Sequence, residues 1–356
     1  MSDPYTLRIL ELDGGGERGY LSLNFLSLFV QQWGINPREL WKYFDVICGT
    51  SIGGMMALAL AIGKSTDDLS PLFTTQGKLI FSTNGTPSNR ATTVDKLYSI
   101  GVSGVPFYGT DPGTGYGSAL LTSQIQSIFG SMTMQDLLTN SIIPTYKVEF
   151  REGTTNIDTG VYTLCSNVNY PDFVAQNELI SNVALVTSAA PFYLPSIVLN
   201  GVSTGTLNGR YIDGGVYQNN PSSFGRNLAT ILKPTANRCC VLSIGTGLGE
   251  MGFDDDLLRA PSVASDPIIS VTNLFSLFDI AGTGGQESVS KNLYLEATYS
   301  LNNLYYYRFQ PNLDMNEDTE LDNTTDEILG YYVTTATNWY NDDIDNITTF
   351  LGHLTA

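Results

Sequence analysis

A serine between two apolar runs constrains the fold of this chain more than any other feature. Ser51 lies between Gly49 and Gly53 in the sequence G-T-S-I-G, after an apolar run at residues 44–48 and before another at residues 53–62. In that context the G-x-S-x-G pattern is typical of a sharp strand-to-helix turn that exposes the serine hydroxyl. The flanking glycines permit the tight turn and the close packing of strand on helix. The pattern therefore predicts a β–α unit with Ser51 at its apex as a candidate nucleophile.

Strand-like and helix-like runs alternate along most of the chain. Near-continuously apolar strands separated by helices are typical of a parallel sheet. We therefore predict an α/β fold, with a mostly parallel central sheet, helices on both faces and three layers in all. Strands are expected at residues 7–12, 44–48, 143–150, 161–166, 210–212, 240–244 and 304–310. Helices are expected at residues 21–33, 53–62, 121–129, 134–140, 177–188, 222–232, 267–281 and 286–299, and from 325 onward.

No internal repeat and no Pro- or Ser-rich linker divides the chain. With 356 residues, 42% of them hydrophobic, it can bury one large α/β core. We expect one α/β domain over residues 1–250 and a helical C-terminal extension over 251–356 that packs on it. Residues 82–118 contain seven glycines and three prolines, which fits either a lid or a plain surface loop. The apolar run at 268–278 is interpreted as a buried core helix rather than a lipid-contacting wall.

The charge balance excludes some partners. The chain carries 17 basic and 35 acidic residues, a net charge of −18. Nucleic acids and anionic membranes are bound through Lys and Arg, so we expect no nucleic-acid partner and no electrostatic docking to a membrane. No apolar run reaches the roughly 18 residues of a membrane span, and no secretion signal is visible. Four cysteines without paired spacing complete the prediction of a cytoplasmic protein with reduced thiols.

The chain has a single histidine, His353, three residues from its C-terminal end. A Ser-His-Asp triad requires an imidazole held rigidly between nucleophile and acid, which a chain end seldom provides. We therefore expect the base for Ser51 to be a carboxylate. One histidine also excludes His-paired zinc motifs, and the acidic run at 254–256 lacks the spacing of a calcium loop, so no metal site is predicted.

Two aspartates follow predicted strands. Asp213 precedes Gly214 and Gly215, and Asp13 opens a longer glycine run. Both positions are expected at the carboxyl edge of the sheet, where parallel α/β folds place their sites. A carboxylate acts as a base toward serine only if it is buried and well placed. Sequence spacing alone leaves the choice between Asp13 and Asp213 open.

The glycine run itself, Gly14, Gly15 and Gly16, lies between a predicted strand and a predicted helix. Such a loop can cradle a phosphate, hold an oxyanion during acyl transfer, or simply turn the chain. No G-x-x-x-x-G-K-[ST] motif follows, which disfavours a nucleotide site. Together with an exposed serine, the loop is better explained as an oxyanion hole. Arg18 can orient this loop, contact an acidic substrate group or lie at the surface.

A second match to G-x-S-x-G surrounds Ser203. It leads into the polar sequence T-L-N-G at residues 206–209 rather than into a helix. We therefore interpret Ser203 as a serine of a hairpin turn and not as a nucleophile.

Three motifs in one order carry a family resemblance. They are D-G-G-G-E-R-G at residues 13–19, G-T-S-I-G-G at 49–54 and D-G-G at 213–215. The run S-A-A-P-F-Y-L-P at 188–195 precedes the last of them. In this order the motifs resemble the patatin-like phospholipase family, over about residues 7–247.

The resemblance implies a lipid acyl hydrolase of the phospholipase A, lysophospholipase or esterase type. It assigns Ser51 as nucleophile and Asp213 as base, the N–H groups of residues 14–16 to the oxyanion hole, and Arg18 to the support of that loop. No cofactor is implied, and the partner is a phospholipid or another acyl-ester lipid, met transiently at a membrane or micelle surface. Ile52 replaces a residue that is commonly smaller. Two alternatives stay open: a storage or structural protein with little activity, and a ligand-gated effector that degrades membranes.

Overall fold

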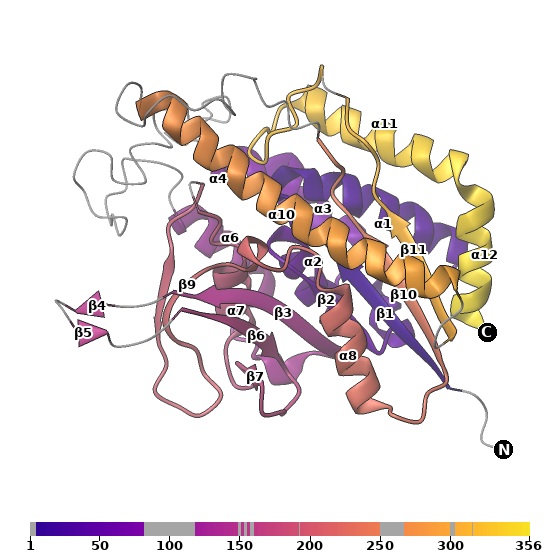
Figure 1. Cartoon of the computed structure of the whole chain (residues 1–356), viewed down its shortest axis with the longest axis horizontal. Coiled ribbons are helices and arrows are strands. Elements are labelled where there is room, and N and C mark those ends of the chain that lie inside the picture. Colours follow the sequence, from indigo (N-terminus) through magenta and orange to yellow (C-terminus); the bar gives the residue numbers. More distant parts are fainter. Residues whose placement is uncertain are drawn as a thin grey trace.

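A computed structural model describes residues 5–81, 118–148, 151–152, 155–156, 160–191, 193–249, 267–299, 303–314 and 316–356. Within these residues a nine-stranded sheet runs through the middle of the molecule, and helices cover both of its faces (Figure 1). The predicted α/β fold with a mostly parallel sheet is confirmed. The interpretation of residues 82–118 falls outside the described residues, apart from Ser118, where a helix begins. The interpretation of 268–278 concerns side chains that are likewise not described.

The strands follow the order β11-β10-β1-β2-β3-β6-β7, and β9 and β8 extend the sheet from β3. Their bounds are β1 Thr6–Leu12, β2 Val46–Gly49, β3 Asn140–Lys147, β6 Val161–Ser166, β7 Phe173–Val174, β8 Ile197–Asn200, β9 Asn208–Asp213, β10 Arg238–Ile244 and β11 Leu304–Phe309. A separate two-stranded pair consists of β4 (Arg151–Glu152) and β5 (Thr155–Asn156).

The helices of the described residues agree with most of the predicted ones. They are α1 Gly19–Trp33, α2 Ile52–Ala61, α3 Thr66–Pro71, α4 Lys78–Ile80, α6 Ser118–Phe129, α7 Ile180–Thr187, α8 Ser222–Leu232, α10 Pro267–Thr298, α11 Asp326–Asp342 and α12 Ile344–Thr355.

Three predicted helices, at two places in the chain, differ from the structure. The predicted helix at 134–140 is only a 3-10 turn, Met134–Asp136, and Asn140 already pairs with Val46 as the start of β3. Pairing with a neighbouring strand outweighs a weak local helix preference. The two helices predicted at 267–281 and 286–299 form one continuous helix, α10. Glycines between them cost about 1 kcal/mol each relative to alanine and do not prevent a helix that packs on other elements.

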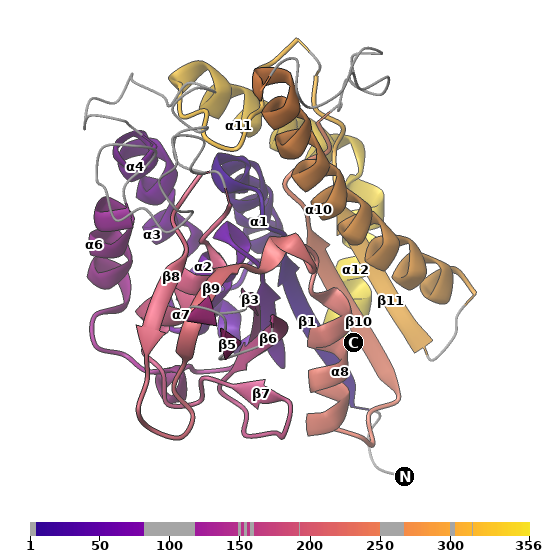
Figure 2. The same cartoon turned by 60° about the vertical axis from the view of Figure 1, so that its left-hand side comes forward.

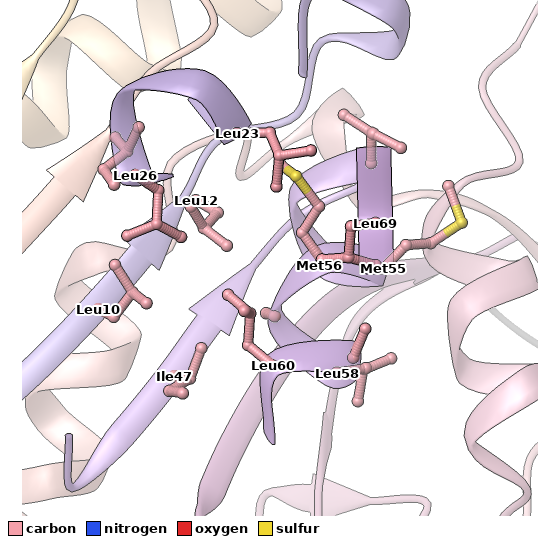
Figure 3. Close-up of a cluster of buried hydrophobic side chains, with 14 of the residues drawn as sticks. Leu10, Leu12, Leu23, Leu26, Ile47, Met55, Met56, Leu58, Leu60 and Leu69 are labelled. Atoms are coloured by element: carbon pink, nitrogen blue, oxygen red, sulfur yellow. The ribbon is translucent and has the colours of Figure 1, made fainter. Parts of the chain in front are cut away.

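The two faces of the sheet carry two separate hydrophobic cores. Side chains alternate along a strand, so Leu10 and Leu12 of β1 face the larger core, together with side chains of α1 and α2 (Figure 3). Side chains of α7, α11 and α12 belong to the same core. Leu7 and Ile9 face the smaller core, where Leu228 of α8 and Leu293 of α10 pack. Figure 2 shows α8 and α10 together on that side of the sheet. This division confirms the predicted three-layer arrangement.

Strand β3 joins a parallel half of the sheet to an antiparallel half. The strands β11, β10, β1, β2 and β3 run parallel to their neighbours in turn. Beyond β3 the pairings with β6 and β9 are antiparallel. The first residues of β3 pair with β2, and Thr145 and its successors pair with β9. Strand β6 occupies one edge of β3. Strands β2 and β9 therefore share the other edge, where the carboxyl end of β2 faces the carboxyl end of β9.

The last third of the chain is built into the same sheet. Strand β11 pairs in parallel with β10 over residues Cys239 to Ile244. Helix α11 packs on α1, and α12 packs on β11. Among the helices of the described residues, none is long and apolar enough to cross a bilayer.

Candidate active site

The turn between β2 and α2 holds Ser51 in a conformation that few residues adopt. Its backbone angles are φ 55° and ψ −128°, a combination that costs free energy and occurs mainly at functional sites. The turn needs glycine on both sides. A Cβ on Gly49 would lie 2.4 Å from the carbonyl oxygen of Gly53, and one on Gly53 would lie 2.2 Å from that of Leu12. Because the backbone segments approach so closely here, they hold the turn and the Ser51 side chain in one position.

Neighbouring hydroxyl groups anchor the turn. The Ser51 N–H donates a hydrogen bond to Thr187 Oγ1 at 3.1 Å, and the Thr187 hydroxyl donates to the Pro144 carbonyl at 2.6 Å. On the other side, the Thr50 hydroxyl donates to the carbonyl of Gln218 at 2.7 Å. The strained turn is thus held by two segments far from it in sequence.

Asp213 reaches Ser51 from the opposite direction. It is the last residue of β9 and pairs with Thr145 of β3. Asp213 lies beyond the carboxyl end of β2, at the edge of the sheet where it was expected, but the strand that carries it runs antiparallel to β3. The Ser51 side chain lies close enough to the Asp213 carboxylate to stabilise its charged form. Serine and aspartate are therefore neighbours.

The environment of Asp213 suits a general base. Its exposed fraction is 2%, and its Oδ1 accepts a hydrogen bond from the Gly215 N–H at 2.6 Å. Burial raises the pKa of Asp213 from 3.8 to about 7, although the hydrogen bond from the Gly215 N–H and the nearby Ser51 side chain oppose the shift. A base with a pKa near the working pH can take a proton and return it with little cost. Gly214 lets the chain turn here, since a Cβ would lie 2.3 Å from the Pro144 carbonyl oxygen.

The glycine loop after β1 presents free N–H groups. The Gly14 N–H donates to the Asn219 carbonyl at 3.4 Å. For the N–H groups of Gly15 and Gly16 the described residues provide no acceptor. Gly16 has a positive φ of 54°, and a Cβ on Gly15 would lie 2.3 Å from Thr246 Oγ1. Of the three N–H groups expected in the oxyanion hole, that of Gly14 is already used, and those of Gly15 and Gly16 have no acceptor among the described residues.

One pocket gathers these groups. Its lining includes Ser51, Asp213, the three loop glycines, Arg18 and Gly215. The other glycines singled out from the sequence, Gly49, Gly53 and Gly214, do not line it and instead allow close backbone packing beneath it. Apolar side chains form much of the remaining wall, namely Ile52, Met55, Leu72, Phe73, Ile80, Phe81, Leu121, Tyr193, Leu194 and Leu321. The last third of the chain contributes Gly282, Thr283 and Gln286 in addition to Leu321. An elongated apolar ligand with one polar group fits such a lining.

Comparison with known proteins agrees with this geometry. The sequence profile of the family described as "Patatin-like phospholipase" matches residues 10–223. The chain belongs to the patatin-like phospholipase family. It is 33% identical over 257 residues to a cGAMP-activated phospholipase from Vibrio cholerae serotype O1, covering 68% of this chain and 65% of that protein. It is also 29% identical over 274 residues to a protein of the same name from Escherichia coli, covering 74% and 67%.

A plant relative shows the same extent of similarity. Patatin-like protein 1 of Oryza sativa subsp. indica is 29% identical over 265 residues, covering 67% of this chain and 58% of that protein. The match to the curated relatives thus spans about two thirds of their length or less. The patatin-like match ends at residue 223, before β10, α10 and β11.

The second candidate aspartate of this patatin-like chain faces another partner. Asp13 is fully buried and does not line the pocket. Arg308 of β11 donates to both of its carboxylate oxygens, Nη1 to Oδ1 at 3.0 Å and Nη2 to Oδ2 at 2.5 Å. Asp13 is therefore held by a cation and has no contact with Ser51 among those described.

The single histidine lies at the other end of the sheet. The His353 ring stacks on Tyr305 with 3.9 Å between ring centroids. Tyr305 is near the amino end of β11, and Ser51 follows the carboxyl end of β2, which runs in the same direction. This placement agrees with the expectation that the base is not an imidazole.

Several positioning residues were not found from the sequence. Thr187 and Asn219 carry no motif of their own, and Gln286 and Arg308 come from the segment without family resemblance. Asn219 donates to the Gly14 carbonyl at 3.3 Å and to Gln286 Oε1 at 2.9 Å. Among the described residues, no cluster of His, Cys, Asp or Glu side chains could hold a metal ion.

Proposed function

We propose that this chain hydrolyses acyl esters of glycerolipids, as a phospholipase A, lysophospholipase or esterase, with Ser51 as nucleophile and Asp213 as its base. One observation carries the proposal: a strained, half-buried serine lies beside a buried aspartate inside an apolar pocket. Family membership supports it. The free N–H groups of Gly15 and Gly16 supply the remaining element that acyl transfer requires.

The reaction follows from these contacts. Asp213 takes the Ser51 proton as Oγ attacks the ester carbonyl carbon, and the N–H groups of Gly15 and Gly16 stabilise the resulting oxyanion. The proton on Asp213 passes to the leaving alcohol oxygen as the C–O bond breaks, which leaves the acyl chain on Ser51. Asp213 then takes a proton from water, which attacks the acyl-enzyme. The fatty acid leaves and Ser51 regains its proton.

The pocket lining indicates the substrate class. The apolar side chains contributed by α2, by the 72–81 segment and by residues 193–194 can bury an acyl chain. We infer a phospholipid or similar acyl-ester lipid, met in the cytoplasm at a membrane or micelle surface. We also infer that residues 1–250 and 251–356 act as one catalytic unit, since Gln286 and Leu321 line the pocket.

Labelling with a fluorophosphonate tests the nucleophile. Such a probe phosphonylates a serine that is activated beside an oxyanion hole, so we expect one adduct per chain, mapped to Ser51 by mass spectrometry. Ser51→Ala is expected to abolish both labelling and release of fatty acid from phosphatidylcholine. Ser203→Ala is the matched control, because Ser203 lies in the second G-x-S-x-G sequence. His353→Ala is a second control, and both are expected to behave as wild type. Hydrolysis by Ser51→Ala at the wild-type rate would overturn the proposal.

Gating by a ligand is the second candidate. The relatives from Vibrio cholerae and Escherichia coli are named cGAMP-activated phospholipases, and residues beyond the family match complete the pocket. If this chain is gated in the same way, fatty acid release is expected to rise about 10- to 100-fold on addition of cGAMP, in the range of typical allosteric coupling. The rate is measured with and without cGAMP, with Ser51→Ala in parallel. An unchanged, substantial rate would identify a constitutive enzyme, and silence under both conditions would favour a storage role.

A further inference from the structure

A row of polar side chains crosses three strands inside the smaller core. Glu11 of β1 pairs in register with Ser243 of β10, which in turn pairs with Arg308 of β11. These three side chains are on the face of the sheet where Ile9, Val241 and Leu304 are buried among apolar neighbours. Polar groups in such a place are costly unless they satisfy one another. We therefore ask which part of the molecule this row of polar side chains keeps in place.

Hydrogen bonds connect the row. Ser243 donates to Glu11 Oε2 at 2.5 Å, and Arg308 Nη1 donates to Ser243 Oγ at 2.8 Å. Burial raises the pKa of Glu11 well above its ordinary value, and the neighbouring Asp13 adds to the effect, which favours the neutral acid. Arg308 Nη1 also lies 3.7 Å from Glu11 Oε2, but the hydrogen bonds of the guanidinium to a carboxyl group both go to Asp13.

Asp13 links the row to the glycine loop. Its carboxylate accepts hydrogen bonds from both Nη1 and Nη2 of Arg308, and its N–H donates to the Ile244 carbonyl at 3.0 Å. The next residue, Gly14, accepts a hydrogen bond from the Thr246 hydroxyl at 2.9 Å. The position from which Gly15 and Gly16 project is therefore set by β10 and β11.

We propose that Arg308 is a positioning residue for the oxyanion loop, through its two hydrogen bonds to Asp13. The proposal rests on the proposed acyl hydrolase function and deepens it, because it places a determinant of catalysis outside the family match at residues 10–223. Arg308 does not line the pocket. It acts by fixing the direction of the loop N–H groups.

Charge gives Arg308 a second role in the same contact. An oxyanion that forms beside Gly15 and Gly16 has the Asp13 carboxylate close by in the chain, and two negative charges repel strongly in a buried site. The guanidinium neutralises that carboxylate. Without Arg308, the loop loses one of its anchors and the charge that balances Asp13.

The test compares two arginines with similar ion pairs. Arg308→Met removes the pair with Asp13, and Arg226→Met removes the bidentate pair of α8 with Glu296 of α10, at 2.6 and 2.7 Å. We measure kcat and KM on a soluble ester, normalised to the number of sites that react with fluorophosphonate. Arg308→Met is expected to lower kcat about 100-fold at unchanged KM, the loss seen when an oxyanion donor is misplaced. Arg226→Met is expected to keep kcat within about 2-fold of wild type.

Inhibitor binding separates positioning from stability. The affinity of a trifluoromethyl ketone, which forms a tetrahedral adduct with the serine, is expected to fall with kcat/KM in Arg308→Met. The affinity of the corresponding unreactive ether is expected to stay unchanged. Arg308→Lys, which keeps the charge with one donor group, is expected to lose about 10-fold in kcat, and it serves if the methionine variant does not fold. Asp13→Asn/Arg308→Met, which removes both charges, is expected to recover part of the loss.

Each outcome decides one claim. If Arg308→Met and Arg308→Lys turn over like Arg226→Met, Arg308 is only structural and the proposal is overturned. If wild type neither hydrolyses esters nor is labelled at Ser51, the proposed function is wrong, and the role of Arg308 that rests on it is wrong as well. Loss of kcat with retained ether binding in the Arg308 variants supports both.

Discussion

Asp213→Asn is expected to lower kcat/KM on the order of 10⁴-fold, at the upper end of what a general base contributes. Asparagine keeps the shape of the side chain and can still accept the hydrogen bond from the Gly215 N–H. It cannot accept a proton from Ser51. Initial rates on a soluble ester measure the loss, and a decrease of less than about 10-fold would assign the base to another group.

The pH dependence of the wild type follows from the same group. Because burial raises the pKa of Asp213 to about 7, the carboxylate is the minor form at pH 5 and the major form at pH 8. The logarithm of kcat/KM is expected to rise with a slope of one up to about pH 7 and to level off above it. A profile that is flat from pH 5 to 9 would contradict this assignment.

Stability provides the control for folding. The folded pKa of Asp213 lies above its unfolded value, so the folded state loses stability as the pH rises from about 4 to about 7. The loss amounts to roughly 4 kcal/mol. Asp213→Asn removes this cost and is therefore expected to unfold at a higher urea concentration than wild type at pH 8, with a smaller difference at pH 5. Inactivity combined with higher stability cannot be attributed to misfolding.

Gly53→Ala is expected to have the largest effect on stability. A Cβ at this position would lie 2.2 Å from the Leu12 carbonyl oxygen and 2.4 Å from that of Asp13. Both are backbone atoms of β1 or the start of the glycine loop, and they cannot move without displacing the sheet. We expect a loss of about 4 kcal/mol or more in the free energy of unfolding, measured by urea denaturation.

Gly330→Ala is the matched control for Gly53→Ala. Gly330 is also helical, in α11, and a Cβ there would have nothing within 4 Å. Alanine favours a helix over glycine, so this change is expected to raise stability by about 0.5–1 kcal/mol. Equal effects of the two substitutions would show that close packing at Gly53 has no energetic weight.

The sequence predicted best what is encoded locally. The β2–Ser51–α2 turn depends on adjacent residues, so its position and its two essential glycines could be predicted. The run at 134–140 was misassigned because pairing with β2, about 90 residues earlier in the chain, decides its structure. The direction of β9 depends likewise on β3.

Residues that act through distant partners left no local signal. Thr187 anchors the Ser51 turn through a side chain that is 136 positions away in the chain. Arg308 holds Asp13 across 295 positions. Neither belongs to a motif whose spacing can be read, and only the sheet order brings them to the site.

Strand β3 fixes the distance between Ser51 and Asp213, because β2 and β9 both pair with it along one edge. β2 and β9 are each aligned to this strand by their own ladder, so the separation of Ser51 and Asp213 is counted in strand residues of about 3.4 Å each. The turn between β8 and β9, which contains Ser203, lies outside the part of β9 that pairs with β3. Its length does not enter the distance between Ser51 and Asp213, because β9 is held to β3 by its own pairing. A slip of β9 by one residue along β3, in contrast, would separate them at once.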